Sequence, residues 1–238
     1  MKEMHCHILP TIDDGSKSLE MSYEILKCAK EVGIKDIILT PHYVEMSKYV
    51  SNRENNLKIL NELKEFTKEM DINLYLGNEV YINYNILELL KKGEISTLNN
   101  SRYMLIELPL NSKFNNTKSV FIELINHGIT PILAHPERYT EYKNDIDFFF
   151  ELRELGVLMQ INYPSLLGYY GSCAKKQAKR LLKANLISFV GSDTHRDIDA
   201  YKSVNKAIKK LTKIVGYEKM LDYTERNILK IINNEEIS

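Results

Sequence analysis

Five of the six histidines in this chain stand where their side chains could share a metal centre, and four carboxylates occupy comparable places. His5 and His7 flank a cysteine, whereas the sixth histidine, His127, falls in an ordinary helical segment. The candidate ligands are His5, His7, Asp14, His42, Glu79, Glu107, His135, Asp193 and His195. Nine nitrogen and oxygen donors are too many for one zinc ion. They suit two or three divalent ions bound side by side, as in a hydrolytic centre.

Spacing supports this interpretation, although each residue alone has a more ordinary one. Side chains alternate along a strand, so His5 and His7 are expected on one face and Cys6 on the other. Asp14 precedes a glycine and could belong to a simple turn. Glu79 and Glu107 end apolar runs, where a carboxylate needs a partner, which could be a salt bridge or a cation. Their joint placement at the ends of apolar runs favours the cation.

Seven short β-like runs alternate with amphipathic helical stretches along the chain, which predicts parallel strands joined by crossover helices. The runs cover residues 3–7, 36–40, 73–77, 103–107, 130–135, 157–162 and 186–190. Every candidate ligand lies at the carboxyl-terminal end of such a run or just beyond it, and only the run ending at Asn162 brings none. These ends meet at one mouth in a closed barrel but not in an open sheet. We therefore predict a single α/β domain over residues 1–238, a distorted (β/α)7 barrel resembling a TIM barrel.

Composition narrows the function classes. The 238 residues contain 32 lysines and arginines and 32 aspartates and glutamates, so the zero net charge argues against nucleic acid as a partner. No signal-like or membrane-spanning apolar segment is present, and three widely spaced cysteines, Cys6, Cys28 and Cys173, suggest a reduced, cytoplasmic setting. None of them begins a Cys-x5-Arg motif, and serine-hydrolase and P-loop motifs are missing too.

Several of these motifs together resemble a known family. They are His5-Cys-His7 followed by Asp13-Asp14-Gly15, then Thr40-Pro-His42, Gly77-Asn-Glu79, Ala134-His-Pro-Glu-Arg138-Tyr and Gly191-Ser-Asp-Thr-His195. The chain resembles the polymerase-and-histidinol-phosphatase (PHP) superfamily, and within it the bacterial capsular-polysaccharide tyrosine-protein phosphatases. The resemblance runs from Met1 to about Tyr201.

The resemblance implies a distorted barrel with three metal ions, commonly manganese; iron, magnesium and zinc also suit the donor set. It places His5, His7, Glu79 and Asp193 on one ion, Glu79 as a bridge with Glu107 and His135 on the second, and Asp14, His42 and His195 on the third. Arg138 matches a phosphate-binding arginine. The family's second arginine, a few residues after the last histidine, is missing here, so only Arg196 is available.

We therefore expect a cytoplasmic metal-dependent protein-tyrosine phosphatase in which a metal-bound hydroxide attacks phosphorus and Arg138 and Arg196 stabilise the phosphoryl oxygens. The expected substrate is a phosphotyrosine-bearing protein, such as the tail of a membrane-associated tyrosine kinase of polysaccharide biosynthesis. Two alternatives are a small-molecule phosphatase such as histidinol phosphatase and a non-catalytic partner of such a kinase. Histidinol phosphate would need an acidic partner for its ammonium group, and only Asp13 and Glu137 are obvious outside the ligand set.

The pocket for a phosphotyrosine should have aromatic side chains near its mouth. Tyr43, Tyr139 and Tyr163 each follow a proposed mouth position. The segment from Ser165 to Cys173, which contains Tyr169 and Tyr170, is predicted to be a loop that shapes the mouth.

Overall fold

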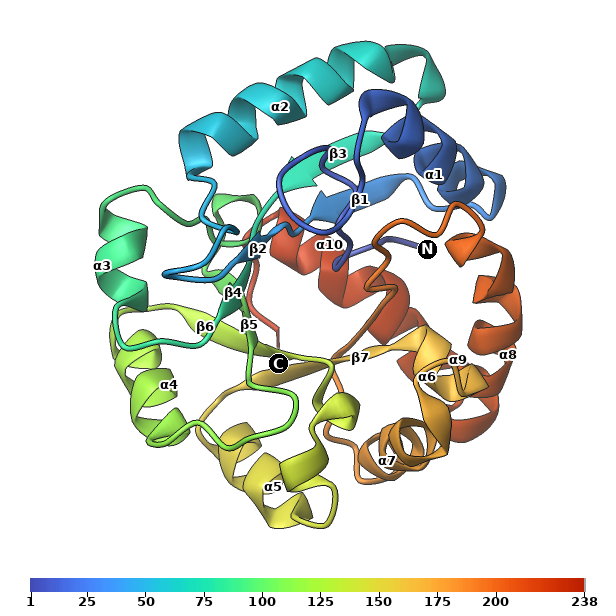
Figure 1. The fold of residues 1–238 in the computed structure, drawn as a ribbon. Helices are drawn as coiled ribbons and strands as arrows, with labels where there is room; N and C mark the ends of the chain where they lie inside the picture. The colour runs from blue at the N-terminus through green and yellow to red at the C-terminus, as the bar shows by residue number, and fades with distance from the viewer. Residues whose placement is uncertain (238) are drawn as a thin grey trace.

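The computed structural model describes residues 1–237, and its strands form a parallel barrel surrounded by helices (Figure 1). The strands are β1 (Asp36–Leu39), β2 (His42–Tyr43), β3 (Asn73–Leu76), β4 (Glu79–Tyr81), β5 (Tyr103–Glu107), β6 (Thr130–Ala134), β7 (Leu158–Asn162) and β8 (Phe189–Gly191). All pairs are parallel: β1 pairs with β3, and the other six follow the order β2-β4-β5-β6-β7-β8. The predicted α/β barrel is confirmed.

The first predicted strand, residues 3–7, is wrong as a regular strand, although it lies where a strand would close the barrel. It makes isolated bridges to Ile37 on one side and Thr194 on the other. Part of the reason is local: the side-chain oxygen Oε1 of Glu3 accepts the N–H groups of Met4 and His5, at 2.9 and 3.0 Å. These amides therefore bond to a carboxylate instead of a ladder.

Backbone hydrogen bonds nevertheless run from this first segment to both of its neighbours. On one side, the N–H of Ile38 donates to Glu3 O at 2.9 Å and that of Thr40 to Cys6 O at 2.9 Å. On the other, His7 N–H donates to Thr194 O at 2.7 Å. The segment therefore connects β1 to β8. Together with β1 and β2 as one interrupted strand position, and β3 and β4 as another, this gives the seven positions predicted.

The helices cover the outside of the barrel. They are α1 (Leu19–Glu31), α2 (Arg53–Phe66), α3 (Ile86–Lys91), α4 (Thr117–Asn126), α5 (Ile146–Glu154), α6 (Tyr163–Leu167), α7 (Gly171–Lys183), α8 (Val204–Val215), α9 (Tyr217–Leu221) and α10 (Asn227–Ile232). Short 3-10 turns and one π-helical turn join some of them. Within the described residues, no helix has the length and apolar character needed to span a membrane.

One helix was not expected. The segment predicted to be a loop begins inside α6, which starts directly after β7 with a proline in its first turn, a favourable position for that residue. Gly168 ends the helix with a φ of 95°, a conformation that favours glycine. Tyr169 and Tyr170 then form the short turn to α7, so the loop is present but is much shorter than predicted.

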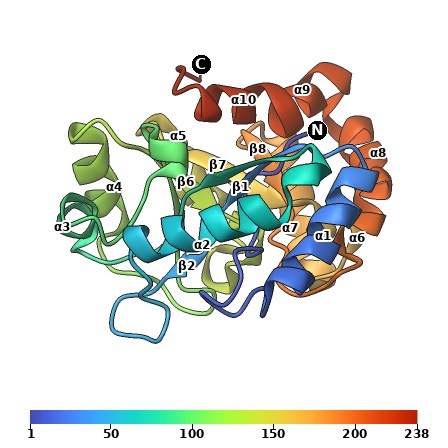
Figure 2. The ribbon, with the colours of Figure 1, turned by 90° about the horizontal axis from the view of Figure 1, so that it is seen from above.

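The barrel interior changes character along its axis. Side chains two apart on a strand share a face, so Tyr103, Leu105 and Glu107 of β5 all point to one side of the sheet. A buried apolar cluster fills the amino end of the interior and is closed by Ile228 and Ile231 of α10. Figure 2 shows α10 across this end, with the loop after β2 extending at the opposite end. The carboxyl end is where the polar residues lie.

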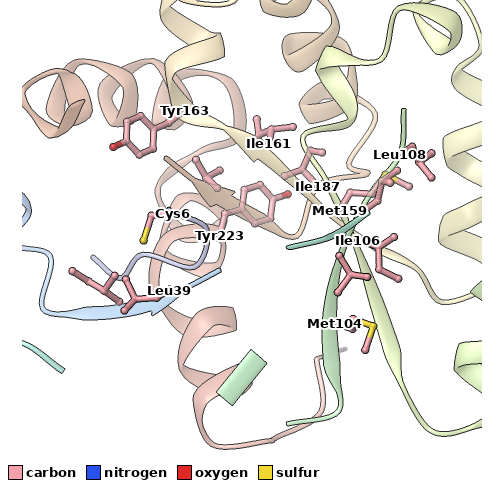
Figure 3. Close-up of a cluster of buried hydrophobic side chains, with 14 of the residues drawn as sticks. Cys6, Leu39, Met104, Ile106, Leu108, Met159, Ile161, Tyr163, Ile187 and Tyr223 are labelled. Carbon is pink, nitrogen blue, oxygen red and sulfur yellow. The ribbon is translucent and has the colours of Figure 1, made fainter. Parts of the chain in front are cut away.

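A second apolar layer separates the strands from the helices. Met104 and Ile106 of β5 and Met159 and Ile161 of β7 belong to it, as does Cys6 (Figure 3). Cys6 is fully buried, and its Sγ lies 3.6 Å from Ile38 O. As predicted, Cys6 faces away from the polar centre, because its two histidine neighbours face toward it.

Candidate metal centre

All nine predicted ligands converge at the carboxyl end of the barrel. Three sets have potential ligand atoms within 4.8 Å of one another: His5, His7, Glu79 and Asp193; His7, Asp14, His42 and His195; and His42, Glu79 and Glu107. The first set is the one that the family resemblance implied. The other two differ from the implied sets: His7 is added to Asp14, His42 and His195, and His42 stands in place of His135 beside Glu79 and Glu107.

Glu79 lies between the three sets. It is fully buried at the start of β4, where its Oε2 is 3.2 Å from the Nε2 atoms of both His5 and His7 and 3.1 Å from Nδ1 of His42. Its other oxygen, Oε1, is 2.9 Å from Nε2 of His135, which in turn is 3.7 Å from Oε1 of Glu107. One carboxylate that touches four imidazoles has the position required of a bridging ligand.

Two of the ligands are on strained backbone. His135 follows β6 with a φ of 30°, and Asp193 follows β8 with a φ of 56°. Left-handed conformations cost non-glycine residues about 1–3 kcal/mol and persist where the surroundings impose them. His135 comes directly after β6 and Asp193 two residues after β8. At these bends, the side chain of His135 meets Glu79 and that of Asp193 meets His5 and His7.

Several carboxylates are crowded together in the centre, and their negative charges change the pKa values of their neighbours. Burial and the nearby charges of Glu79 and Asp193 raise the pKa of Glu107 to about 9. Burial opposes protonation of His5, yet the same two carboxylates raise the pKa of His5 to about 9. Carboxylates crowded in this way hold protons unless cations replace them. The electrostatics of the cluster therefore match a cation site.

The unpartnered atoms of the centre agree with this. Oδ1 of Asp14 and Oε2 of Glu79 are buried and accept no hydrogen bond within the described part of the chain. Buried acceptors of this kind are costly unless a donor or a cation faces them. Imidazole and carboxylate donors without a thiolate suit manganese, iron, magnesium or zinc. The residues present therefore fit a centre of divalent ions.

Asp13 was predicted to lie outside the ligand set, and in the structure it orients two of the ligands. Its Oδ2 accepts a hydrogen bond from Nδ1 of His7 at 2.7 Å and from the N–H of His42 at 2.9 Å, while Oδ1 accepts from Gly15 N–H at 2.8 Å. The charge and hydrogen bonds of His7 outweigh the effect of burial and lower the pKa of Asp13 to about 2. Gly15 is required here, since a Cβ would lie 1.9 Å from His7 O.

The strand β7 contributes no metal ligand itself, but its side chains orient two of the proposed ligands, His5 and Asp193. On β7, Oε1 of Gln160 is 2.8 Å from Nδ1 of His5, and its amide donates to Oδ1 of Asn162 at 2.8 Å. Asn162 in turn donates to Oδ2 of Asp193 at 2.8 Å. Outer partners of this type fix the tautomer and direction of a ligand. The signal was the Gln160-x-Asn162 spacing, which repeats the His5-x-His7 spacing.

The two arginines have different surroundings. Arg138 donates from Nη1 to Oδ2 of Asp193 at 2.6 Å, and its guanidinium lies 4.4 Å from the ring centroid of Tyr170. Arg196 donates from Nε to the backbone oxygens of Asp14 at 2.5 Å and Gly15 at 3.2 Å. Arg138 is therefore at the centre, whereas Arg196 holds the turn that carries Asp14.

Two hollows open at the mouth. A pocket of about 380 Å³ is lined by Glu107, His135 and Arg138, with Tyr49 and Tyr81 also at its surface. A larger groove of about 930 Å³ adjoins it and is lined in part by Tyr169 and Tyr170. Tyrosines do surround the opening, but two of them, Tyr49 and Tyr81, were not predicted.

The prediction that three other tyrosines lie at the mouth was wrong. Tyr43, Tyr139 and Tyr163 are buried in the apolar core. The hydroxyl of Tyr139 donates to Ala134 O at 2.6 Å and accepts from Leu108 N–H at 3.0 Å, so it ties the ends of β5 and β6 together. Side chains alternate beyond a strand end, and adjacency to a mouth residue therefore often means the opposite face.

This fold and this site define a class of proteins: α/β barrels that gather histidines and carboxylates around divalent ions at the carboxyl ends of their strands. Within that class, the family model described as capsular polysaccharide synthesis, CpsB/CapC, matches residues 1–233. The chain belongs to this family, which confirms the capsular branch of the resemblance inferred from the motifs.

Individual relatives match along the whole chain. CapC of Staphylococcus aureus is 38% identical over 100% of this chain and 93% of its own length. The tyrosine-protein phosphatase YwqE of Bacillus subtilis is 33% identical over 100% and 93%. A crystal structure from a study of YwqE and of CpsB from Streptococcus pneumoniae, described as metal-dependent tyrosine phosphatases, superimposes with a TM-score of 0.92 at 30% identity, over 100% of this chain and 96% of that one.

A more distant structure shares the fold alone. The histidinol phosphate phosphatase of Lactococcus lactis superimposes with a TM-score of 0.58 at 15% identity, over 88% of this chain and 93% of that one. The barrel is thus common to several chemistries, and the function must be argued from the site.

Proposed function

We propose that this protein is a metal-dependent phosphatase that hydrolyses phosphotyrosine in proteins. The observation that carries the proposal is the position of Glu79, a buried carboxylate in contact with four histidines beside an arginine-lined pocket. The relatives named as tyrosine-protein phosphatases match over at least 93% of their own length and support the same activity.

Two or three divalent ions, manganese first among them, would be held by the nine ligands in the groups that the family resemblance implies. His5, His7, Glu79 and Asp193 would hold one ion, Glu79, Glu107 and His135 a second, and Asp14, His42 and His195 a third. When bound, such ions make water a nucleophile at neutral pH and neutralise charge on a phosphoryl group. The chain contributes the geometry: Asp13 fixes His7 and His42, and Gln160 fixes His5.

Arg138 would bind a phosphoryl oxygen. One of its five N–H groups is used by Asp193, which anchors the guanidinium at the pocket wall and leaves others for an anion. Arg196 also lines the adjoining groove, but its hydrogen bonds make positioning of Asp14 its first role. We propose that its remaining N–H groups give weaker help to the phosphoryl oxygens.

Aromatic side chains would hold the phenol ring of the substrate. Tyr49 and Tyr81 line the pocket, and the ring of Tyr49 stacks against that of His42 at a centroid distance of 6.1 Å. Tyr170, on the other side of Arg138, lines the groove. A phosphate bound at Arg138 would thus have aromatic surface on both sides for its leaving group.

Histidinol phosphatase, the alternative activity, is disfavoured because neither of two carboxylates is free to bind its substrate. Its substrate needs an acidic partner for the ammonium group, and the two residues considered for this role are both engaged. Asp13 is bound to His7. Glu137, in the 3-10 turn after β6, is buried against the start of α6, where its Oε1 accepts from Asn162 N–H at 2.9 Å and from the Ser165 hydroxyl at 2.7 Å.

The setting of the reaction is part of the proposal. We propose that the protein acts in the cytoplasm on the phosphorylated tail of a membrane-associated tyrosine kinase, in keeping with its membership of a capsular polysaccharide family. We also propose that residues 1–238 work as one PHP-type unit; Ser238 itself lies outside the described residues.

The test compares four substrates at equal manganese concentration: p-nitrophenyl phosphate, a phosphotyrosyl peptide, a phosphoseryl peptide and histidinol phosphate. We expect the phosphotyrosyl peptide to have a higher kcat/KM than histidinol phosphate, the phosphoseryl peptide to be poor, and EDTA to abolish turnover until manganese is restored. Tenfold preference for histidinol phosphate would favour the alternative activity. Full activity in protein that metal analysis finds empty would refute the metal centre, and a metal-loaded protein without turnover would indicate a non-catalytic partner.

A further inference from the structure

The groove beside the metal pocket is larger than a single phosphotyrosine needs. It occupies about 930 Å³ between the turn after α6 and the start of α8. Arg138 and His195 belong to it, together with Tyr169 and Tyr170 on one side and Ser203 and Lys206 on the other. A substrate bound at Arg138 could therefore continue along the groove toward α8.

Four lysines gather where the groove reaches the helices. Lys206 and Lys210 are four residues apart on α8, and Lys175 and Lys179 are four apart on α7. The helices α7 and α8 pack against each other, which brings the two pairs near one another. In keeping with this, desolvation and the charges of Lys175, Lys206 and Lys179 lower the pKa of Lys210. None of them forms a salt bridge with any residue in the range 1–237. We call them the α7–α8 lysine cluster.

The acidic residues of the groove do not neutralise this cluster. Asp199 pairs with Lys202 at 2.6 Å, and Asp193 pairs with Arg138. Asp14 lies at the other end of the groove, where it faces His42 and His195. Asp197 is left without a cation among the described residues, but Arg196 lies beside it in the chain with no carboxylate partner of its own. In a chain of zero net charge, the end of the groove at α8 therefore has a local positive excess.

We propose that this groove binds the polypeptide that flanks the phosphotyrosine, and that the α7–α8 lysine cluster selects acidic side chains in it. The inference rests on the proposed function and adds the class of protein substrate. Charge complementarity supports it, since carboxylates on the substrate would relieve the repulsion between lysines placed four apart on each helix.

An anionic membrane is the other surface that lysines could meet, but the structure favours a peptide. On α8, Val204, Ala207 and Leu211 are buried, and the half-buried Ile208, Ile214 and Val215 pack against the same core. The apolar face of the helix is therefore directed into the protein and not available for insertion into lipid. Lys206 also lines the same groove as His195, which a flat membrane surface could not enter.

The experiment uses the full chain loaded with manganese and three phosphotyrosyl peptides whose flanking residues are glutamate, glutamine or lysine. We expect the glutamate peptide to have the highest kcat/KM, mainly through KM. The double variant Lys206→Gln/Lys210→Gln should lower kcat/KM for that peptide by about three- to ten-fold, as expected for two exposed ion pairs. Raising the ionic strength from about 0.05 to about 0.5 M should remove most of the difference between peptides.

The matched control is Lys58→Gln/Lys64→Gln, which removes the same charge from two exposed positions of another helix, α2. It should leave the peptide preference unchanged, and both variants should hydrolyse p-nitrophenyl phosphate as the parent does. Equal kcat/KM for the glutamate and glutamine peptides would overturn this inference alone, as would an equal effect of the two double variants. Binding to phosphatidylglycerol vesicles that is lost in Lys206→Gln/Lys210→Gln, without peptide preference, would point to a membrane instead. Hydrolysis of no peptide would overturn the proposed function and this inference with it.

Discussion

The two ends of the barrel interior are built from the same strands and differ in almost everything else. At the amino end, Leu105, Ile132 and Phe189 pack with α10 in a dry apolar cluster. At the carboxyl end, Glu107 follows Leu105 by two residues on the same face and lies among other carboxylates. Two of the proposed ligands there, His135 and Asp193, also have strained backbone. One end stabilises the fold and the other strains it, so changes at the two ends should affect different measurements.

The largest effect on activity should come from Glu79→Gln. The amide keeps the shape of the side chain but removes the charge that four histidines contact. We expect phosphatase activity to fall by more than about 10²-fold, beyond the range for residues that only orient ligands. Metal analysis should show lost ions, while the thermal unfolding temperature of the metal-free protein should fall little or even rise. A variant that retains both metal and activity would contradict the bridging role.

Arg138→Ala should come next, with a fall in kcat/KM of about 10²-fold, by analogy with other single donors to a transition-state anion. Arg138→Lys should not restore it, because lysine lacks the fork and cannot bind Asp193 and a phosphate together. Metal content must be measured in both variants, since Asp193 is a proposed ligand. Arg196→Ala serves as the comparison and should have a smaller effect; equal losses would contradict the different roles assigned to the two arginines.

Asp13→Asn tests whether the polar end depends on its outer partners. The amide nitrogen cannot accept a hydrogen bond, so one of the bonds from His7, His42 or Gly15 is lost. Metal affinity should fall by roughly 10- to 100-fold, with activity recovered at high manganese concentration. Titration of the apo-protein with manganese measures this. Asp71→Asn, an exposed carboxylate on the surface, is the control and should change nothing in the titration.

Leu105→Ala should have the smallest effect on catalysis and a large one on stability. It leaves a cavity in the apolar cluster, where Leu105 is fully buried, and should lower the free energy of unfolding by about 2–5 kcal/mol. Below the unfolding temperature, kcat per folded molecule and metal content should remain close to those of the parent. Denaturant unfolding and metal analysis on the same preparation decide this. Loss of metal from folded protein would mean that the two ends are coupled.

The sequence predicted the barrel and its ligands because both depend on simple regularities. Strands alternate with helices, and ligands such as Glu107 and His135 end apolar runs. Asp13 was missed because an Asp-Asp-Gly turn does not show which carboxylate faces inward. Gln160 was missed because amides are not metal ligands, although their spacing on the strand was visible. The positive φ angles of His135 and Asp193 and the orientation of Tyr139 depend on tertiary packing, which no local pattern contains.

The first segment of the chain closes the barrel against the last strand. Ser192 N–H donates to Oε1 of Glu3 across 189 residues of sequence, and His5 meets Asp193 in the same ligand set. Contacts between residues this far apart in the sequence have a large entropic cost of loop closure and slow folding. During synthesis, His5 and His7 leave the ribosome first but have no completed site until residues near 195 follow them. The centre can therefore form only after both segments are in place. A fragment that lacks the segment of His5 and His7, or the segment of Asp193 and His195, should not bind metal as the intact protein does.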